Sequence, residues 1–128
     1  MRKQYHFRPS RKGFYAWDVD RLIEQSHGLP VIEVKLSEIS TAQDFGPVTD
    51  CRSFAEHMQL VEETDLAYPI ILCPENRVMD GLHRVIKAYR NGDDRIKAVR
   101  FEAMPKPDYE DVYAQDLPYD ADARQNDP

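Results

Sequence analysis

Five consecutive residues, Asp80-Gly81-Leu82-His83-Arg84, combine the side chains and the backbone freedom that a phosphate site requires. They follow a short apolar segment and open a stretch with helical periodicity. The first backbone N–H groups of a helix have no intrahelical partner, and the helix dipole favours negative charge there. Gly81 lets a ligand approach the main chain closely, while His83 and Arg84 supply polar side chains. The pattern predicts an anion site at the start of a helix.

Each of these residues also has a purely structural explanation. Asp80 is a good helix N-cap, and it can also pair with Arg84 at i, i+4 spacing, which is worth a few tenths of a kcal/mol on an exposed face. Gly81 can serve only to ease a tight entry into the helix, and His83 can simply be solvated. The five residues by themselves leave both explanations open.

The elements that position this segment follow from the spacing of apolar residues. The apolar character of residues 68–73 predicts a strand, and the composition of residues 74–77 predicts a turn after it. A second short strand is predicted at Val78-Met79. A helix follows and ends at Asn91-Gly92, and residues 95–101 predict a final strand. The apolar residues of the helix recur at the spacing of one buried face, so we expect that face to pack on the sheet; they are Leu82, Val85, Ile86 and Tyr89.

Three further elements are expected upstream. Asp18 is the predicted N-cap of a helix that runs to His27, and the alternation in residues 31–36 predicts a half-buried strand. Ser53-Phe54-Ala55-Glu56 has the form of a capping box. It predicts the start of a helix whose inward-facing residues are Phe54, Met58 and Val61.

The segment from Tyr68 to Phe101 resembles the signature region of the ParB/sulfiredoxin-like superfamily. The shared order is strand, turn, Asp80-Gly81-Leu82-His83-Arg84, helix, Asn91-Gly92 and strand. Residues 29–39 are similar to the opening strand and short helix of the same domain. The resemblance implies an α/β (α+β) fold in which a small mixed sheet is flanked by helices.

The same resemblance implies a ligand. Sulfiredoxins carry Gly-Cys-His-Arg at the matching helix start and hold nucleotide phosphates there. ParB proteins bind CTP with a related glycine-arginine box, and free-serine kinases of this fold carry Asp-Gly-His-His-Arg. By this likeness Gly81, His83 and Arg84, together with Asp80 and Leu82 of the same turn, are expected to bind a nucleotide or another phosphorylated small molecule.

Phosphoryl transfer is the natural reaction class if the chain is an enzyme. Magnesium would then accompany the nucleotide, with Asp80 or Glu38 as oxygen ligands. Glu38 is the candidate catalytic residue, because free-serine kinases of this fold place a glutamate near the opening strand; its structural alternative is a solvated residue at the start of a short helix. Weaker candidates for the same cleft are Asp44, Arg52, His57 and Lys87.

Two departures from the superfamily pattern argue against activities that are found in other members. Leu82 stands where sulfiredoxins have their nucleophilic cysteine, so reduction of a sulfinic acid is not expected. Only 27 residues follow Phe101, and they do not resemble the helix-turn-helix domain of ParB proteins. The alternatives to a phosphate-binding enzyme are a non-catalytic regulatory or partner-binding module and a ParB-like DNA-associated protein.

Composition is that of an ordinary globular protein. The chain has 128 residues, of which 31% are charged and 41% hydrophobic, which suits one domain. No apolar run approaches the roughly 20 residues of a membrane helix, and no signal-peptide core follows the N-terminus, so we expect a cytoplasmic protein without a membrane partner. Cys51 and Cys73 lack the spacing of a zinc site.

Charge divides the chain into three parts. Residues 1–12 carry five basic and no acidic side chains, whereas residues 104–128 carry two basic and seven acidic ones. We therefore expect a basic N-terminal arm at residues 1–16, a single domain at 17–104 and an acidic, proline-containing tail at 105–128. The arm is expected either to be a solubilising terminus or to fold onto the acidic body or tail. The net charge of −6 argues against nucleic acid as a partner.

Overall fold

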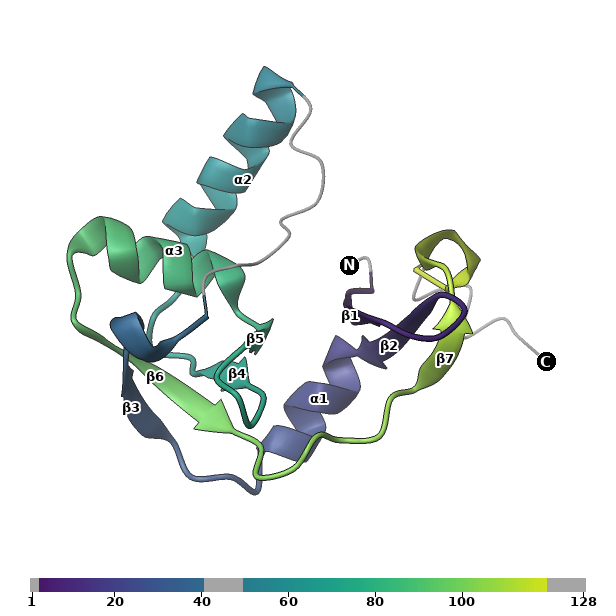
Figure 1. Cartoon of the computed structure of the whole chain (residues 1–128). Coiled ribbons are helices and arrows are strands. Elements are labelled where there is room, and N and C mark those ends of the chain that lie inside the picture. Colours follow the sequence, from purple (N-terminus) through teal and green to yellow (C-terminus); the bar gives the residue numbers. More distant parts are fainter. Residues whose placement is uncertain (1–2, 41–49, 120–128) are drawn as a thin grey trace. The chain divides into compact units, whose positions relative to one another are not determined.

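The computed structural model describes residues 3–40 and 50–119 of the chain (Figure 1). It has the mixed helix and strand content of an α+β fold, as the sequence predicts. The chain folds into two compact units. The first comprises the segments up to Gly28 and from Met104 onward, and the second comprises Leu29–Ala103. None of the described helices is long and apolar enough to cross a membrane.

The first unit is a three-stranded antiparallel sheet with one helix. Its elements are β1 (Tyr5–Pro9), β2 (Phe14–Asp18), α1 (Val19–Ser26), β7 (Tyr109–Val112) and the short 3-10 helix η2 (Ala114–Asp116). β2 lies between β1 and β7. The ring centroid of Tyr5 lies 6.1 Å from Phe7, 6.0 Å from Tyr109 and 5.4 Å from Tyr119, so aromatic rings from both ends of the chain pack together.

The terminal segments therefore differ from the basic arm at 1–16 and the acidic tail at 105–128 that their charge suggested. Their strands pair with β2 in one sheet, and their charges are locally matched. Lys3 Nζ lies 2.9 Å from Asp18 Oδ2, and Arg21 Nη1 lies 2.6 Å from Asp108 Oδ1. The basic segment thus folds onto the body and the acidic segment, which is one of the two arrangements that its charge allowed, and aromatic residues of both ends form part of the contact.

α1 has the predicted cap. The Asp18 side chain accepts a hydrogen bond from the backbone N–H of Asp20, at 2.9 Å. Leu22 is buried on the inner face of the helix. The helix ends at Ser26, its C-cap residue His27 is in the right-handed conformation, and the following Gly28 is not left-handed.

The second unit is a four-stranded mixed sheet with two helices. Its elements are β3 (Ile32–Lys35), the 3-10 helix η1 (Leu36–Glu38), α2 (Cys51–Glu63), β4 (Ile70–Leu72), β5 (Val78–Asp80), α3 (Leu82–Asn91) and β6 (Arg95–Arg100). The strand order is β3-β6-β4-β5, in which β4 and β6 are parallel and the other two pairs are antiparallel. This is the small mixed sheet with helices that the sequence predicts.

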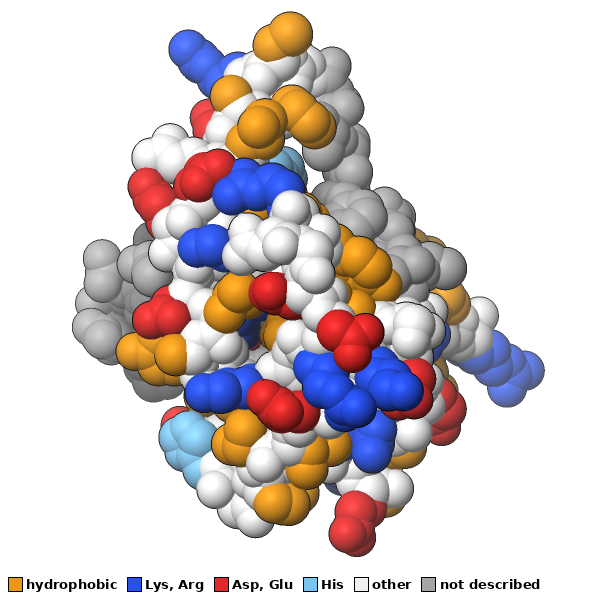
Figure 2. All heavy atoms as spheres, turned by 90° about the vertical axis from the view of Figure 1, so that its left-hand side faces the viewer, with side chains coloured by type: hydrophobic (Ala, Val, Ile, Leu, Met, Phe, Trp, Pro, Cys, Tyr) orange, Lys and Arg blue, Asp and Glu red, His pale blue; other side chains and the backbone are white. Residues whose placement is uncertain are grey.

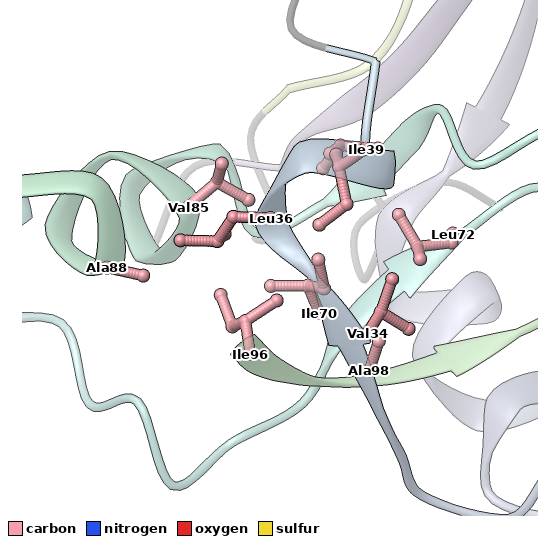
Figure 3. Packing of buried hydrophobic residues seen from close by; sticks show 10 residues of the cluster. Val34, Leu36, Ile39, Ile70, Leu72, Val85, Ala88, Ile96 and Ala98 are labelled. Atoms are coloured by element: carbon pink, nitrogen blue, oxygen red, sulfur yellow. The ribbon is translucent and has the colours of Figure 1, made fainter. Parts of the chain in front are cut away.

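One hydrophobic cluster joins α3 and η1 to this sheet (Figure 3). Val85 and Ala88 are its contribution from α3, and Leu82 packs at its edge. The sheet contributes Val34, Ile70, Leu72, Val78, Ile96 and Ala98. Val99, which follows Ala98 in β6, is buried but lies outside this cluster, because neighbouring strand residues point to opposite faces.

α2 begins earlier than predicted and buries fewer of the residues that were expected to face inward. Its N-cap is Asp50, whose side chain accepts a hydrogen bond from the backbone N–H of Ser53 at 2.8 Å, so the expected start at Ser53 is wrong. Val61 is its buried residue, but Phe54 and Met58 are exposed and not inward-facing as expected. Figure 2 shows hydrophobic side chains on the surface over the α2 end of the molecule.

Candidate functional site

The N-cap of α3 is Gly81 and not Asp80. Asp80 is the last residue of β5, and Gly81 is the N-cap, with a left-handed φ of 106° and no side-chain hydrogen bond capping the helix. A Cβ atom on Gly81 would lie 2.6 Å from Ile70 Cγ2. The glycine is thus required by its backbone conformation and by the close approach of β4.

Arg84 is held by three acceptors near the beginning of β4. Its Nη2 donates to Asp80 Oδ2 at 3.1 Å, and its Nη1 donates to the carbonyls of Tyr68 and Pro69 at 3.2 and 3.1 Å. Both charged side chains are largely shielded, with 15% of Arg84 and 19% of Asp80 exposed. The i, i+4 pair that the sequence allowed as the structural explanation is therefore present.

His83 faces His57 of α2. His57 Nδ1 lies 3.3 Å from His83 Nε2, and the ring centroids are 5.5 Å apart. Burial lowers the pKa of His83 below its usual value of 6.5, the neighbouring His57 and Arg84 lower it further, and Asp80 opposes them. The imidazole of His83 is consequently neutral at pH 7.

Lys87 stabilises the end of α2. Its Nζ donates to the carbonyls of Glu62 and Thr64, at 2.9 and 2.7 Å. A cation is favoured there, since the last carbonyls of a helix are the negative end of its dipole. Arg90 pairs with Glu62 beside it, and this hydrogen bond lowers the pKa of Glu62. These contacts assign Lys87 to the packing of α2 on α3.

The remaining candidates are not joined to the start of α3. Glu38 ends η1 with an exposed side chain, and its backbone carbonyl accepts from Asn76 Nδ2 at 3.3 Å. Arg52 is exposed in the first turn of α2. Within residues 3–40 and 50–119, no hydrogen bond or ion pair links either side chain to residues 80–84. Asp44 lies outside the described residues.

The pairing of His57 with His83 is the feature that sequence patterns did not reveal. His57 was expected only to lie somewhere in the same cleft. Its contact with His83 depends on how α2 turns on α3, which the apolar pattern of α2 predicted incorrectly. A partial signal was available in α3 itself. Lys87 lies four residues after His83, and Arg90 lies three residues after Lys87, which places the three side chains on one face of α3.

In comparisons with known proteins, no family model, no curated protein and no solved structure matches this chain. The resemblance of residues 68–101 to the ParB/sulfiredoxin-like superfamily therefore stays a prediction. The geometry at the start of α3 carries the functional argument.

Proposed function

We propose that the protein binds a phosphate group of a nucleotide or another phosphorylated small molecule at the start of α3. The observation that carries this proposal is the left-handed Gly81 N-cap, which leaves α3 without a side-chain cap. The N–H groups of residues 82–84 are the first of the helix and point toward its N-terminal end. Phosphate oxygens are suitable acceptors for such groups.

The charges around the helix start are compatible with an anion. The first turn of α3 contains no acidic residue. The nearest carboxylate, Asp80, is paired with Arg84, so its negative charge is compensated locally. Residues 81–84 are all half-buried, which leaves each of them partly open to solvent. A phosphate at this point meets the positive end of the helix dipole without an uncompensated negative neighbour.

In this proposal Arg84 is a positioning residue. Its guanidinium group already donates to Asp80 and to two carbonyls next to β4, so it fixes the turn from which the backbone N–H groups project. His83 is the side chain of the turn that we expect to contact the ligand. As a neutral imidazole, it offers the phosphate one N–H donor.

Phosphoryl transfer remains an extension of this proposal. An enzyme needs a second polar group opposite the phosphate, and His57 is the group that faces the turn, from α2. Asp80 is paired with Arg84 and Glu38 is exposed elsewhere in the unit, so these two carboxylates do not support a magnesium site built by the protein. Magnesium would arrive bound to the phosphates of a nucleotide. The alternative is a module that binds the ligand without catalysis.

Thermal-shift measurements with inorganic phosphate, ADP, ATP and CTP, each with and without magnesium, test the proposal. A ligand at about a hundred times its Kd adds about 2.7 kcal/mol to stability, which raises Tm measurably. His83→Glu should abolish this shift, because a carboxylate in the first turn satisfies the N–H groups and repels phosphate. The same charge should leave the unliganded fold intact, since acidic side chains stabilise a helix start by about 0.3–1 kcal/mol.

The matched control is His27→Glu, an exposed histidine at the end of α1 that receives the same change of charge. It should retain the wild-type response to the ligand. If none of the four compounds shifts Tm, or if His83→Glu responds as the wild type does, the site is wrong.

A further inference from the structure

The two facing histidines have the separation of two ligands on one metal ion. His57 Nδ1 and His83 Nε2 are 3.3 Å apart. Two imidazole nitrogens that each lie about 2.0–2.1 Å from a tetrahedral zinc ion are separated by about 3.4 Å. We propose that His57 and His83 together bind a divalent transition-metal ion of the zinc class, bridging α2 and α3.

The chemistry of the pair suits such an ion. A histidine binds metal through the lone pair of a neutral ring nitrogen, so a protonated imidazole cannot serve. The charges nearest His83 are Asp80 and Arg84, and they are paired with each other, so neither acts as an uncompensated charge on a cation at the site. Imidazole nitrogens select Zn²⁺, Ni²⁺ or Cu²⁺ over Mg²⁺.

The protein supplies two ligands to this ion. Among the described residues, no cluster of three or more histidine, cysteine or acidic side chains is arranged to hold a metal. Water fills the remaining positions of a tetrahedral ion, so we expect weaker binding than at a structural zinc site with four protein ligands. In the absence of metal the same two nitrogens can share a hydrogen bond, with one ring donating and the other accepting.

A metal ion bound by both His57 and His83 would strengthen the weak attachment of α2 to α3. α2 has one buried residue, Val61, among its thirteen residues. Among the described residues, α3 also holds the end of α2 through polar interactions, which join Lys87 to the carbonyls of Glu62 and Thr64 and Arg90 to the Glu62 side chain. A metal bond between His57 and His83 should hold α2 on α3 and raise the stability of the second unit.

Calorimetric titration of the full chain with ZnCl₂ alone, in a buffer free of phosphate, tests this inference separately from the proposed function. We expect one Zn²⁺ per chain and no heat from MgCl₂. His57→Ala and His83→Ala should each weaken zinc binding by about tenfold or more, which corresponds to about 1.4 kcal/mol. His27→Ala, which removes an exposed histidine of the first unit, should bind zinc as the wild type does.

A second measurement identifies the ligands and keeps the test valid if one variant folds poorly. Zinc should shift the imidazole proton resonances of His57 and His83 in the wild-type NMR spectrum and leave those of His27 unchanged. Zinc binding that survives His57→Ala, equal shifts at His27, or an absence of binding to the wild type would each overturn the inference.

Discussion

Arg84 shows how one residue can fit a ligand-binding pattern and still serve the fold. Its position in the sequence after Gly81 and His83 suggested a direct phosphate contact. Its side chain instead donates to Asp80, Tyr68 and Pro69, all close to the start of α3. The spacing of Asp80 and Arg84 allowed this pair to be anticipated, but the two carbonyl contacts depend on the path of the chain into β4.

Arg84→Ala should therefore destabilise the protein directly. Loss of the charged donor leaves Asp80 and two carbonyls without their partner, and hydrogen bonds to charged groups are worth about 1.5–3 kcal/mol. Urea unfolding measures this change. Arg52→Ala, which removes an exposed arginine from α2, should change stability by about 0.5 kcal/mol or less. Equal stabilities for the two variants would show that the Arg84 contacts are not significant in solution.

His83 should make stability depend on pH. The fold lowers its pKa below 6.5, mainly by burial and then through His57 and Arg84, against Asp80. Between the lowered pKa and 6.5 the unfolded chain binds more protons at this site, so stability should fall as the pH falls through 6.5. Urea midpoints between about pH 7.5 and pH 5.5 measure this. His83→Gln should flatten the profile in that range, and a profile as steep as the wild type's would contradict the assignment.

At the scale of elements, the sequence predicted the order of strands and helices well, but the buried faces and the starts of the helices less well. Tyr89 of α3, for example, was expected on the buried face and is exposed. The strands and helices from Ile70 to Arg100 follow the predicted order, because each has a regular apolar pattern between clear turn residues. α2 differs because two capping signals overlap. Ser53 matches a capping box, but Asp50 also has an acceptor side chain and begins the helix earlier. Its phase was mispredicted since polar contacts with α3 leave Phe54 and Met58 exposed.

The two possible caps of α2 make separate predictions. Asp50→Ala should lower Tm by a few degrees, because the N-cap loses its acceptor for the backbone N–H of Ser53. Ser53→Ala keeps that acceptor and should lower Tm less. Thermal unfolding followed by circular dichroism compares the two variants. A larger decrease in Tm for Ser53→Ala than for Asp50→Ala would indicate that Ser53 is the N-cap, as the sequence pattern suggested.

At the scale of the whole molecule, charge alone did not decide whether the ends of the chain are solvated or folded onto the rest of the protein. The mixed sheet was implied by the resemblance, and its strands are signalled one after another by apolar segments between residues 32 and 100. The sheet of the first unit joins β1 to β7 through β2, and pairing between segments about 100 residues apart leaves little signal in a single sequence. The aromatic residues that make this contact are split between the two ends, and their charged neighbours dominate the local composition.

Removal of residues 109–128 should therefore damage the first unit. The shortened chain lacks β7 and the backbone carbonyl of Pro118, to which the Tyr5 hydroxyl donates. Trp17 is the single tryptophan and lies on β2, so its fluorescence reports on this unit. We expect the Trp17 emission of the shortened chain to shift to the red. Gln115→Ala, at an exposed site in the same segment, is the control and should leave it unchanged.

The central claim is that backbone N–H groups at the start of α3 bind phosphate, and amide NMR measures these groups directly. In a titration of the full chain with ATP, or with inorganic phosphate as the minimal probe, the account predicts that the amide resonances of residues 82–84 shift most. Saturation of these shifts should give the same Kd as calorimetry. Shifts concentrated at the basic residues of segment 1–12, or unchanged amides at residues 82–84 with saturating ligand, would contradict it.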